Sequence, residues 1–106
     1  MTDVRVVLVT APDAATAEKL ARTLVEEQLA ACVNVVPGVR SFYRWEGRVQ
    51  DDSEILLVAK TRAESVDALA ARVDEIHPYE LPEVLEFSAT GGSEAYLKWV
   101  LTETQG

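Results

Sequence analysis

The only histidine of the chain lies in a short segment that concentrates groups able to do chemistry. Residues 77–83 read His-Pro-Tyr-Glu-Leu-Pro-Glu, so that an imidazole, a phenol and two carboxylates lie beside two of the four prolines. Each proline fixes its own φ and keeps the residue before it out of the helical region, which holds His77 and Leu81 extended. A rigid polar link of this kind can carry a functional site, and it can equally serve only to end a helix and lead into a strand.

His77 could bind a soft or borderline metal ion together with other side chains. Imidazole, thiolate and carboxylate all bind copper or zinc, so Cys32, Glu80 and Glu83 are candidate co-ligands. Their spacing matches no known ligand signature, and a lone histidine is more often a capping or hydrogen-bonding residue. Cys32 is more often a small buried hydrophobe than a nucleophile, and a catalytic Cys/His pair needs a third, orienting group.

The other charged segments match no known site. The acidic run at 51–54 lacks the alternating ligands and the glycine of an EF-hand loop, and we interpret it as a solvated bulge. No glycine-rich phosphate loop follows any expected strand, which argues against a standard nucleotide site. Lys60 and Arg62 could contact an anion at a strand end, although charges at strand ends are usually just solvated.

The composition narrows the class of partner. Eighteen acidic against ten basic side chains give a formal net charge of −8, which repels phosphate backbones and anionic headgroups, and no basic run offsets it. We therefore expect neither nucleic acid nor a membrane as partner. The first residues, Met-Thr-Asp, carry no basic region or cleavage signal, and a single cysteine cannot form an intrachain disulfide. A soluble, cytoplasmic protein is expected.

The elements that must position these residues follow from the hydrophobic pattern. The 106 residues, 48% of them hydrophobic, predict one domain at 1–106 with a single core. Runs typical of buried strands alternate with the spacing of amphipathic helices. The expected elements are strands at 4–10, 33–43, 48–60 and 84–88, and helices at 13–28, 61–76 and 93–101. This order predicts an α+β fold, a ferredoxin-like βαββαβ sandwich with an added C-terminal helix.

Capping residues mark where the three helices begin. Asp13 and Ser93 are expected to cap the first and the third helix with their side-chain oxygens. Thr61 and Glu64 have the spacing of a capping box, which predicts that the second helix begins there.

The second and third strands are expected to form a long hairpin with its turn at 45–47. Proline within a strand belongs on an edge or at a bulge, so Pro37 makes the second strand an edge strand. The apolar run at 55–59 predicts that the third strand is buried on both faces. Residues 48–60 would extend roughly 43 Å at about 3.3 Å per residue, whereas a compact chain of this length has a radius of gyration of about 13 Å. Such a hairpin should protrude, and its exposed edge invites another chain.

Sequence motifs spread along nearly the whole chain resemble those of the CutA family of divalent-cation tolerance proteins. The matching segments are Thr10-Ala11-Pro12-Asp13, Ala30-Ala31-Cys32-Val33-Asn34 with Pro37-Gly38, Tyr43 with Trp45-Glu46-Gly47, Ser53-Glu54, Lys60-Thr61, His77-Pro78-Tyr79 with Pro82-Glu83, and Tyr96-Leu97 with Trp99. The resemblance implies a ferredoxin-like homotrimer, similar in architecture to the PII signalling proteins, with long hairpins exchanged between neighbours. It also implies a role in tolerance of copper or other divalent ions.

The chain departs from the family at the positions that the resemblance connects with copper. Members credited with copper ligation have a cysteine just before the Thr-Ala-Pro segment and two histidines before the Pro-Tyr. Here those positions hold Val9 and Ile76, which leaves His77 alone. A single imidazole makes a poor site, so specific copper binding is expected to be weak or absent.

We interpret the chain as a non-enzymatic, trimeric binding or signalling module. Its site would be a cleft between subunits that suits a small polar ligand and is lined by Cys32, Trp45, Lys60, His77, Tyr79 and Glu83. Trp45 at the hairpin tip would also anchor the trimer contact. If the cleft serves recognition, His77 faces Lys60 and Glu83 and contributes little to folding. The alternatives are a copper-binding tolerance protein with His77 as ligand, an enzyme using Cys32 or His77, and a purely structural trimer.

Overall fold

Four strands form one antiparallel sheet, and three α-helices pack against it. The computed structural model describes residues 2–104. The elements of this part of the chain are β1 (Val4–Ala11), α1 (Ala14–Glu26), β2 (Cys32–Trp45), β3 (Arg48–Arg62), the short 3-10 helix η1 (Ala63–Ser65), α2 (Val66–Ile76), β4 (Leu85–Ser88) and α3 (Glu94–Glu103). The strand order β2-β3-β1-β4 is that of two interleaved βαβ units. The predicted α+β, ferredoxin-like fold is confirmed.

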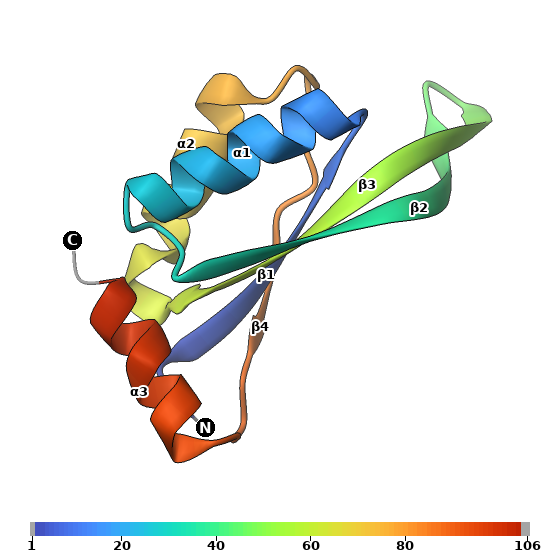
Figure 1. Cartoon of the computed structure of the whole chain (residues 1–106). Coiled ribbons are helices and arrows are strands. Elements are labelled where there is room, and N and C mark those ends of the chain that lie inside the picture. The colour runs from blue at the N-terminus through green and yellow to red at the C-terminus, as the bar shows by residue number, and fades with distance from the viewer. Residues whose placement is uncertain (1, 105–106) are drawn as a thin grey trace.

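The two faces of the sheet are covered unequally. Helices α1 and α2 lie side by side on one face, whereas α3 crosses the other face only near one end (Figure 1). The main core lies under α1 and α2, where Leu20 and Leu69 meet Leu57 of the central strand β3. A smaller cluster joins Val100 of α3 to Val4. Much of the second face therefore has no helix over it.

The N-terminus of α1 forms as its capping residue predicts. The Asp13 carboxylate accepts a hydrogen bond of 2.8 Å from the backbone N–H of Thr16, which satisfies one of the free donors of the first turn. This bond also lowers the pKa of Asp13. Ser93 caps α3 in the same way, through the N–H of Tyr96. Both predicted caps are confirmed.

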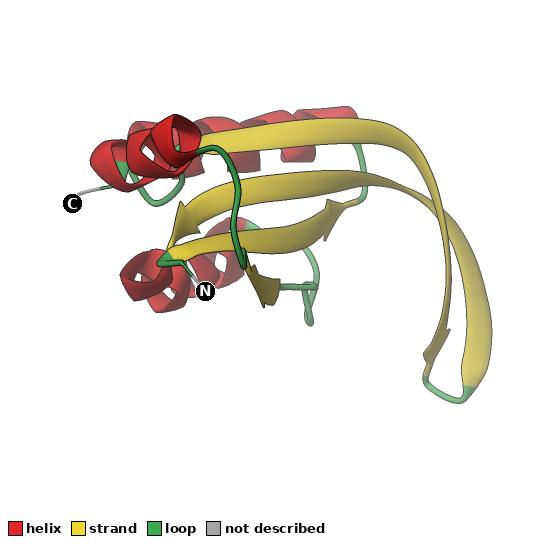
Figure 2. Ribbon diagram, turned by 90° about the horizontal axis from the view of Figure 1, so that it is seen from below, coloured by secondary structure: helices red, strands yellow, loops and turns green. Residues whose placement is uncertain are grey.

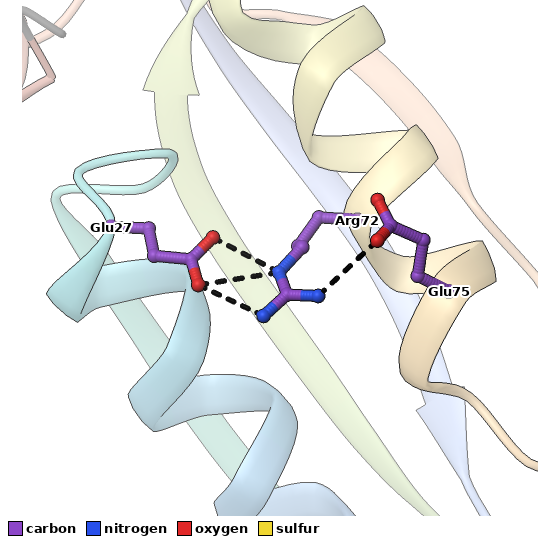
Figure 3. Close-up of polar contacts among 3 residues, drawn as sticks. All are labelled: Glu27, Arg72 and Glu75. Carbon is purple, nitrogen blue, oxygen red and sulfur yellow. Dashed lines mark hydrogen bonds and ion pairs between the residues drawn. The ribbon is translucent and has the colours of Figure 1, made fainter.

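An ion pair fastens the C-terminus of α1 to α2. Glu27 follows the last residue of α1, where the helix dipole disfavours a negative charge. The guanidinium of Arg72 bridges that carboxylate, at 3.0 Å, and the carboxylate of Glu75 (Figure 3). Arg72 therefore offsets the unfavourable charge and ties the two helices together.

The predicted capping box at the start of the second helix is wrong. Thr61 lies inside β3, is fully buried, and donates its hydroxyl to the carbonyl oxygen of Leu29 at 2.7 Å. Strand β3 runs on to Arg62 because it pairs with β1 as far as Val4. Helix α2 therefore begins only at Val66, after the short helix η1.

The hairpin of β2 and β3 protrudes as expected. The strands have 14 and 15 residues, and the described chain measures 44 Å along its longest axis. The far half of the hairpin bends away from the rest of the sheet (Figure 2). Glu46 and Gly47 both have positive φ, at 50° and 76°, which suits the twist of a tight hairpin turn.

The irregularity of the hairpin lies in β2 and not in the acidic run. Strand β2 is an edge strand, as predicted, and its register shifts between Val36 and Val39 at the proline-glycine pair. Gly38 takes a φ of 82° there, which a residue without a side chain adopts at little cost. Residues 51–54 continue the regular ladder of β3, in which Asp51 lies opposite Phe42 and forms an ion pair with the nearby Arg40, so their interpretation as a bulge is wrong.

The third strand was predicted to be buried on both faces, but within one chain only one of its faces is fully buried. Leu57 and Ala59, on the side of α1 and α2, are fully buried. Leu56 and Val58, on the opposite side, are only partly covered. The apolar run of β3 therefore has more hydrophobic surface than this chain alone can cover.

Candidate functional site

A pocket of about 500 Å³ lies between the far half of the hairpin and the loop that joins α2 to β4. This volume is within the range of small-molecule sites in proteins. The hairpin contributes aromatic side chains and an acid, β1 contributes a threonine, and the loop contributes the proline-rich segment. The lining residues are Thr10, Tyr43, Arg44, Trp45, Glu54, Pro78, Tyr79, Glu80, Leu81 and Glu83.

The bulge in β2 decides which hairpin side chains face this pocket. Side chains of a strand alternate between its two faces, and one extra residue exchanges the faces for everything beyond it. Beyond the bulge, Val39 is paired with Glu54 and Tyr43 with Gln50. Tyr43 and Trp45 therefore belong to the same face as Glu54. Without the extra residue, the even-numbered residues of β2 would occupy that face.

Glu54 is the most enclosed charged group of the pocket. Its side chain lies in β3 with only 9% of the residue exposed. The hydroxyl of Tyr79 donates to Glu54 Oε2 at 2.8 Å, linking the hairpin to the loop. Partial burial and this bond to an anion raise the pKa of Tyr79 far above its usual range. Tyr79 therefore stays protonated and keeps donating.

The pKa of Glu83, a second carboxylate of the pocket, is affected by the charge of Glu54. Loss of water around Glu83, and to a lesser degree the nearby charge of Glu54, raise the pKa of Glu83. At the outer edge of the pocket, the hydroxyl of Tyr43 donates a hydrogen bond to Asp52 at 2.5 Å. This bond raises the pKa of Tyr43, as the bond to Glu54 does for Tyr79. The pocket thus combines aromatic rings with carboxylates that form no ion pair within the described chain.

His77 supports the pocket from behind and does not line it. Only 7% of the residue is exposed, and its Nε2 lies 2.7 Å from the carbonyl oxygen of Thr10. A carbonyl only accepts, so Nε2 carries the hydrogen, and Nδ1 accepts from the backbone N–H of Tyr79 at 3.1 Å. The imidazole also lies 4.6 Å from the ring of Tyr79. Both ring nitrogens have a protein partner, so neither is free to bind a metal ion in this conformation.

We therefore expect His77→Ala to lower the free energy of unfolding by about 1 to 3 kcal/mol, because it leaves the buried carbonyl of Thr10 without its donor. Urea denaturation at fixed protein concentration would measure the loss. His77→Gln, which can restore one of the two hydrogen bonds, is the matched control and should lose less. Unchanged stability of His77→Ala would support the recognition role expected from the sequence.

Cys32 and Lys60 lie in a different part of the sheet. They are directly paired across β2 and β3, with Lys60 Nζ 4.0 Å from Cys32 Sγ. Lys60 precedes the end of β3, six residues beyond Glu54, a separation of roughly 20 Å along an extended strand. Within one chain Lys60 therefore lies away from the pocket that Glu54 and Tyr79 line, so the expectation that His77 faces Lys60 across a cleft between subunits stays a prediction. Only a second subunit could bring Lys60 and Cys32 to the pocket.

Of the six candidate site residues, Trp45, Tyr79 and Glu83 lie together in the pocket. Sequence reasoning missed Glu54 and Tyr43 as site residues. Glu54 was visible only as the last member of an acidic run, and Tyr43 as one aromatic residue of a strand. Neither signal could reveal that the bulge brings both to one face.

Two further findings concern the described residues 2–104. No cluster of three or more histidine, cysteine, aspartate or glutamate side chains has an arrangement suited to holding a metal ion there. In the same part of the chain, no helix combines the length and the hydrophobicity that crossing a bilayer requires.

The known proteins that this chain resembles belong to one family. The family model described as CutA1 divalent ion tolerance protein matches residues 5–103. The chain is 49% identical to "Protein CutA, chloroplastic" of Arabidopsis thaliana over 94% of its length, and 46% identical to "Divalent-cation tolerance protein CutA" of Thermus thermophilus over 93%. It superposes on the crystal structure of CutA from Xylella fastidiosa with a TM-score of 0.96 at 42% identity, covering 98% of this chain and 100% of that chain.

The relatives differ in total length. The aligned region is 96% of the Thermus thermophilus protein, whereas it is 55% of the Arabidopsis thaliana protein. The chain thus spans nearly all of the bacterial relative and about half of the plant one.

Proposed function

Because this chain belongs to the CutA1 divalent ion tolerance protein family, we propose that it is a homotrimeric, PII-like binding protein that acts in the cytoplasm in tolerance of divalent ions such as copper. It contributes to tolerance by binding a small polar ligand in the pocket between hairpin and loop. The observation that carries this proposal is the enclosed Glu54 carboxylate, bonded to Tyr79 in a 500 Å³ pocket.

The uncovered sheet face supports a trimer. Leu8 of β1 lies between Val58 of β3 and Leu85 of β4, on the face opposite α1 and α2. Leu85 and Phe87 are each more than half exposed in the single chain. An apolar sheet face of this kind marks a surface that another subunit covers. Three copies that turn these faces toward one another would bury them together.

Ligand binding, and not storage of the metal itself, is the role that the pocket favours. Direct copper binding through His77 has little support, because both of its ring nitrogens are bonded within the chain. The low content of cysteine and the net charge of −8 support a reducing, cytoplasmic setting without nucleic acid or membrane partners.

Growth on toxic copper tests the proposed role of the pocket. We expect a strain that carries Trp45→Ala to be as copper-sensitive as a strain that lacks the gene, because the substitution removes one wall of the pocket. Trp99→Ala is the matched control, since Trp99 lies on α3, away from the pocket, with an exposure of 44% against 38% for Trp45. Full tolerance of the Trp45→Ala strain, or no sensitivity of the deletion strain, would contradict the proposal.

A further inference from the structure

One oxygen of the most enclosed acid of the pocket has no partner within the described chain. Glu54 Oε2 accepts from Tyr79, while no hydrogen bond or ion pair reaches Oε1 among residues 2–104. Every fully buried side-chain nitrogen or oxygen in that part of the chain has a partner. Oε1 is therefore not sealed in, and it opens to the pocket that Glu54 lines. A carboxylate oxygen held in this way is a ready acceptor for a donor that enters from outside.

Within the described residues of one chain, the charge of the pocket is negative and largely uncompensated. Glu54, Glu80 and Glu83 line it, and the described chain contains no ion pair to any of the three. Arg44 is the only cationic residue of the lining, and its pairing with Val49 assigns its side chain to the opposite face of the hairpin. Glu54 is enclosed and Glu83 lies near enough to be affected by its charge, so the pair of carboxylates favours a positive charge between them.

The remaining walls of the pocket are aromatic and apolar. Tyr43, Trp45 and Tyr79 supply ring surfaces, and Pro78 and Leu81 supply aliphatic ones. The faces of aromatic rings attract cations, and they also pack against hydrocarbon chains. A ligand that matches both properties carries a donating cationic head and a short apolar body.

We infer that the pocket binds a small aliphatic amine in its ammonium form. The –NH₃⁺ group donates to Glu54 Oε1 and to Glu83, and the alkyl chain lies against Trp45 and Tyr43. This inference rests on the proposed function, because it names the class of ligand for the same site.

Titration of the ¹⁵N-labelled protein with n-butylammonium chloride tests the inference by NMR. We expect saturable shifts of the Trp45 indole N–H at millimolar concentrations, and no saturable shifts with 1-pentanol or butyrate, which resemble the probe in size but lack its charge. Glu54→Gln should weaken binding about tenfold or more, since it replaces a charged acceptor by a neutral one. Glu83→Gln, on the exposed loop, is a second variant with the same expectation and little risk to folding.

Asp51→Asn is the matched control. It removes one negative charge from the same strand, and its partner Phe42 assigns it to the opposite face of the hairpin, so binding should not change. No saturable shift of the wild-type protein below about 10 mM would overturn the inference, as would equal affinity for 1-pentanol or an equal loss in Asp51→Asn. Displacement of the probe by one equivalent of copper or magnesium would also overturn it, in favour of an inorganic cation. In each of these cases the growth phenotype of Trp45→Ala still decides the proposed function separately.

Discussion

Replacing Leu57 with alanine is expected to lower the free energy of unfolding by about 2 to 5 kcal/mol, a large part of the 5 to 15 kcal/mol that is typical of a domain. Leu57 is fully buried in the central strand β3, between Val9 of β1 and Val35 of β2. It belongs to the core cluster that α1 and α2 cover. Alanine would leave a cavity there, because neighbouring strands and helices hold the surrounding backbone in place.

Denaturant unfolding followed by circular dichroism would measure the loss. All variants are compared at one protein concentration, because assembly contributes to apparent stability. Val49→Ala, in the same strand but 68% exposed, is the control and should change stability by no more than about 0.5 kcal/mol. Equal effects of the two substitutions would show that the core does not depend on β3 as the structure indicates.

The Phe87→Glu substitution is expected to abolish the proposed trimer. Phe87 is 52% exposed on β4, beside Val6, on the sheet face that α1 and α2 leave open. A carboxylate at this position would be buried without a partner when three such faces meet, and the burial of an unpaired charge is strongly unfavourable. Light scattering should give three times the chain mass of 11.6 kDa for the wild type and a single chain mass for the variant.

Val25→Glu is the matched control for this experiment. Val25 is 42% exposed on α1, which covers the other face of the sheet, and its substitution introduces the same charge. We expect this variant to keep the mass of the wild type. A wild-type protein that is monomeric at micromolar concentration would remove the basis of the trimer proposal, and a trimeric Phe87→Glu would place the interface elsewhere.

The sequence by itself determined the elements and their order. Hydrophobic periodicity and capping depend on residues that are close together along the chain, so the ferredoxin-like arrangement and the caps Asp13 and Ser93 could be predicted. The edge position of β2 followed from Pro37, since proline lacks the N–H that a central strand must donate. The capping box at Thr61 failed, because pairing with β1 prolongs β3 through that position.

Only the tertiary structure decided which residues form the site. His77 stands out in the sequence by its setting, yet its partner, the carbonyl of Thr10, lies 67 positions away in the sequence. The bond between Tyr79 and Glu54 joins residues 25 positions apart, and it depends on where the hairpin lies relative to the loop. Placing Tyr43 on the face of Glu54 depends on one extra residue in β2, because a shift by one residue exchanges the two faces of a strand. Local patterns report which face of an element is apolar, whereas the partner of a polar side chain is set by register and packing over long range.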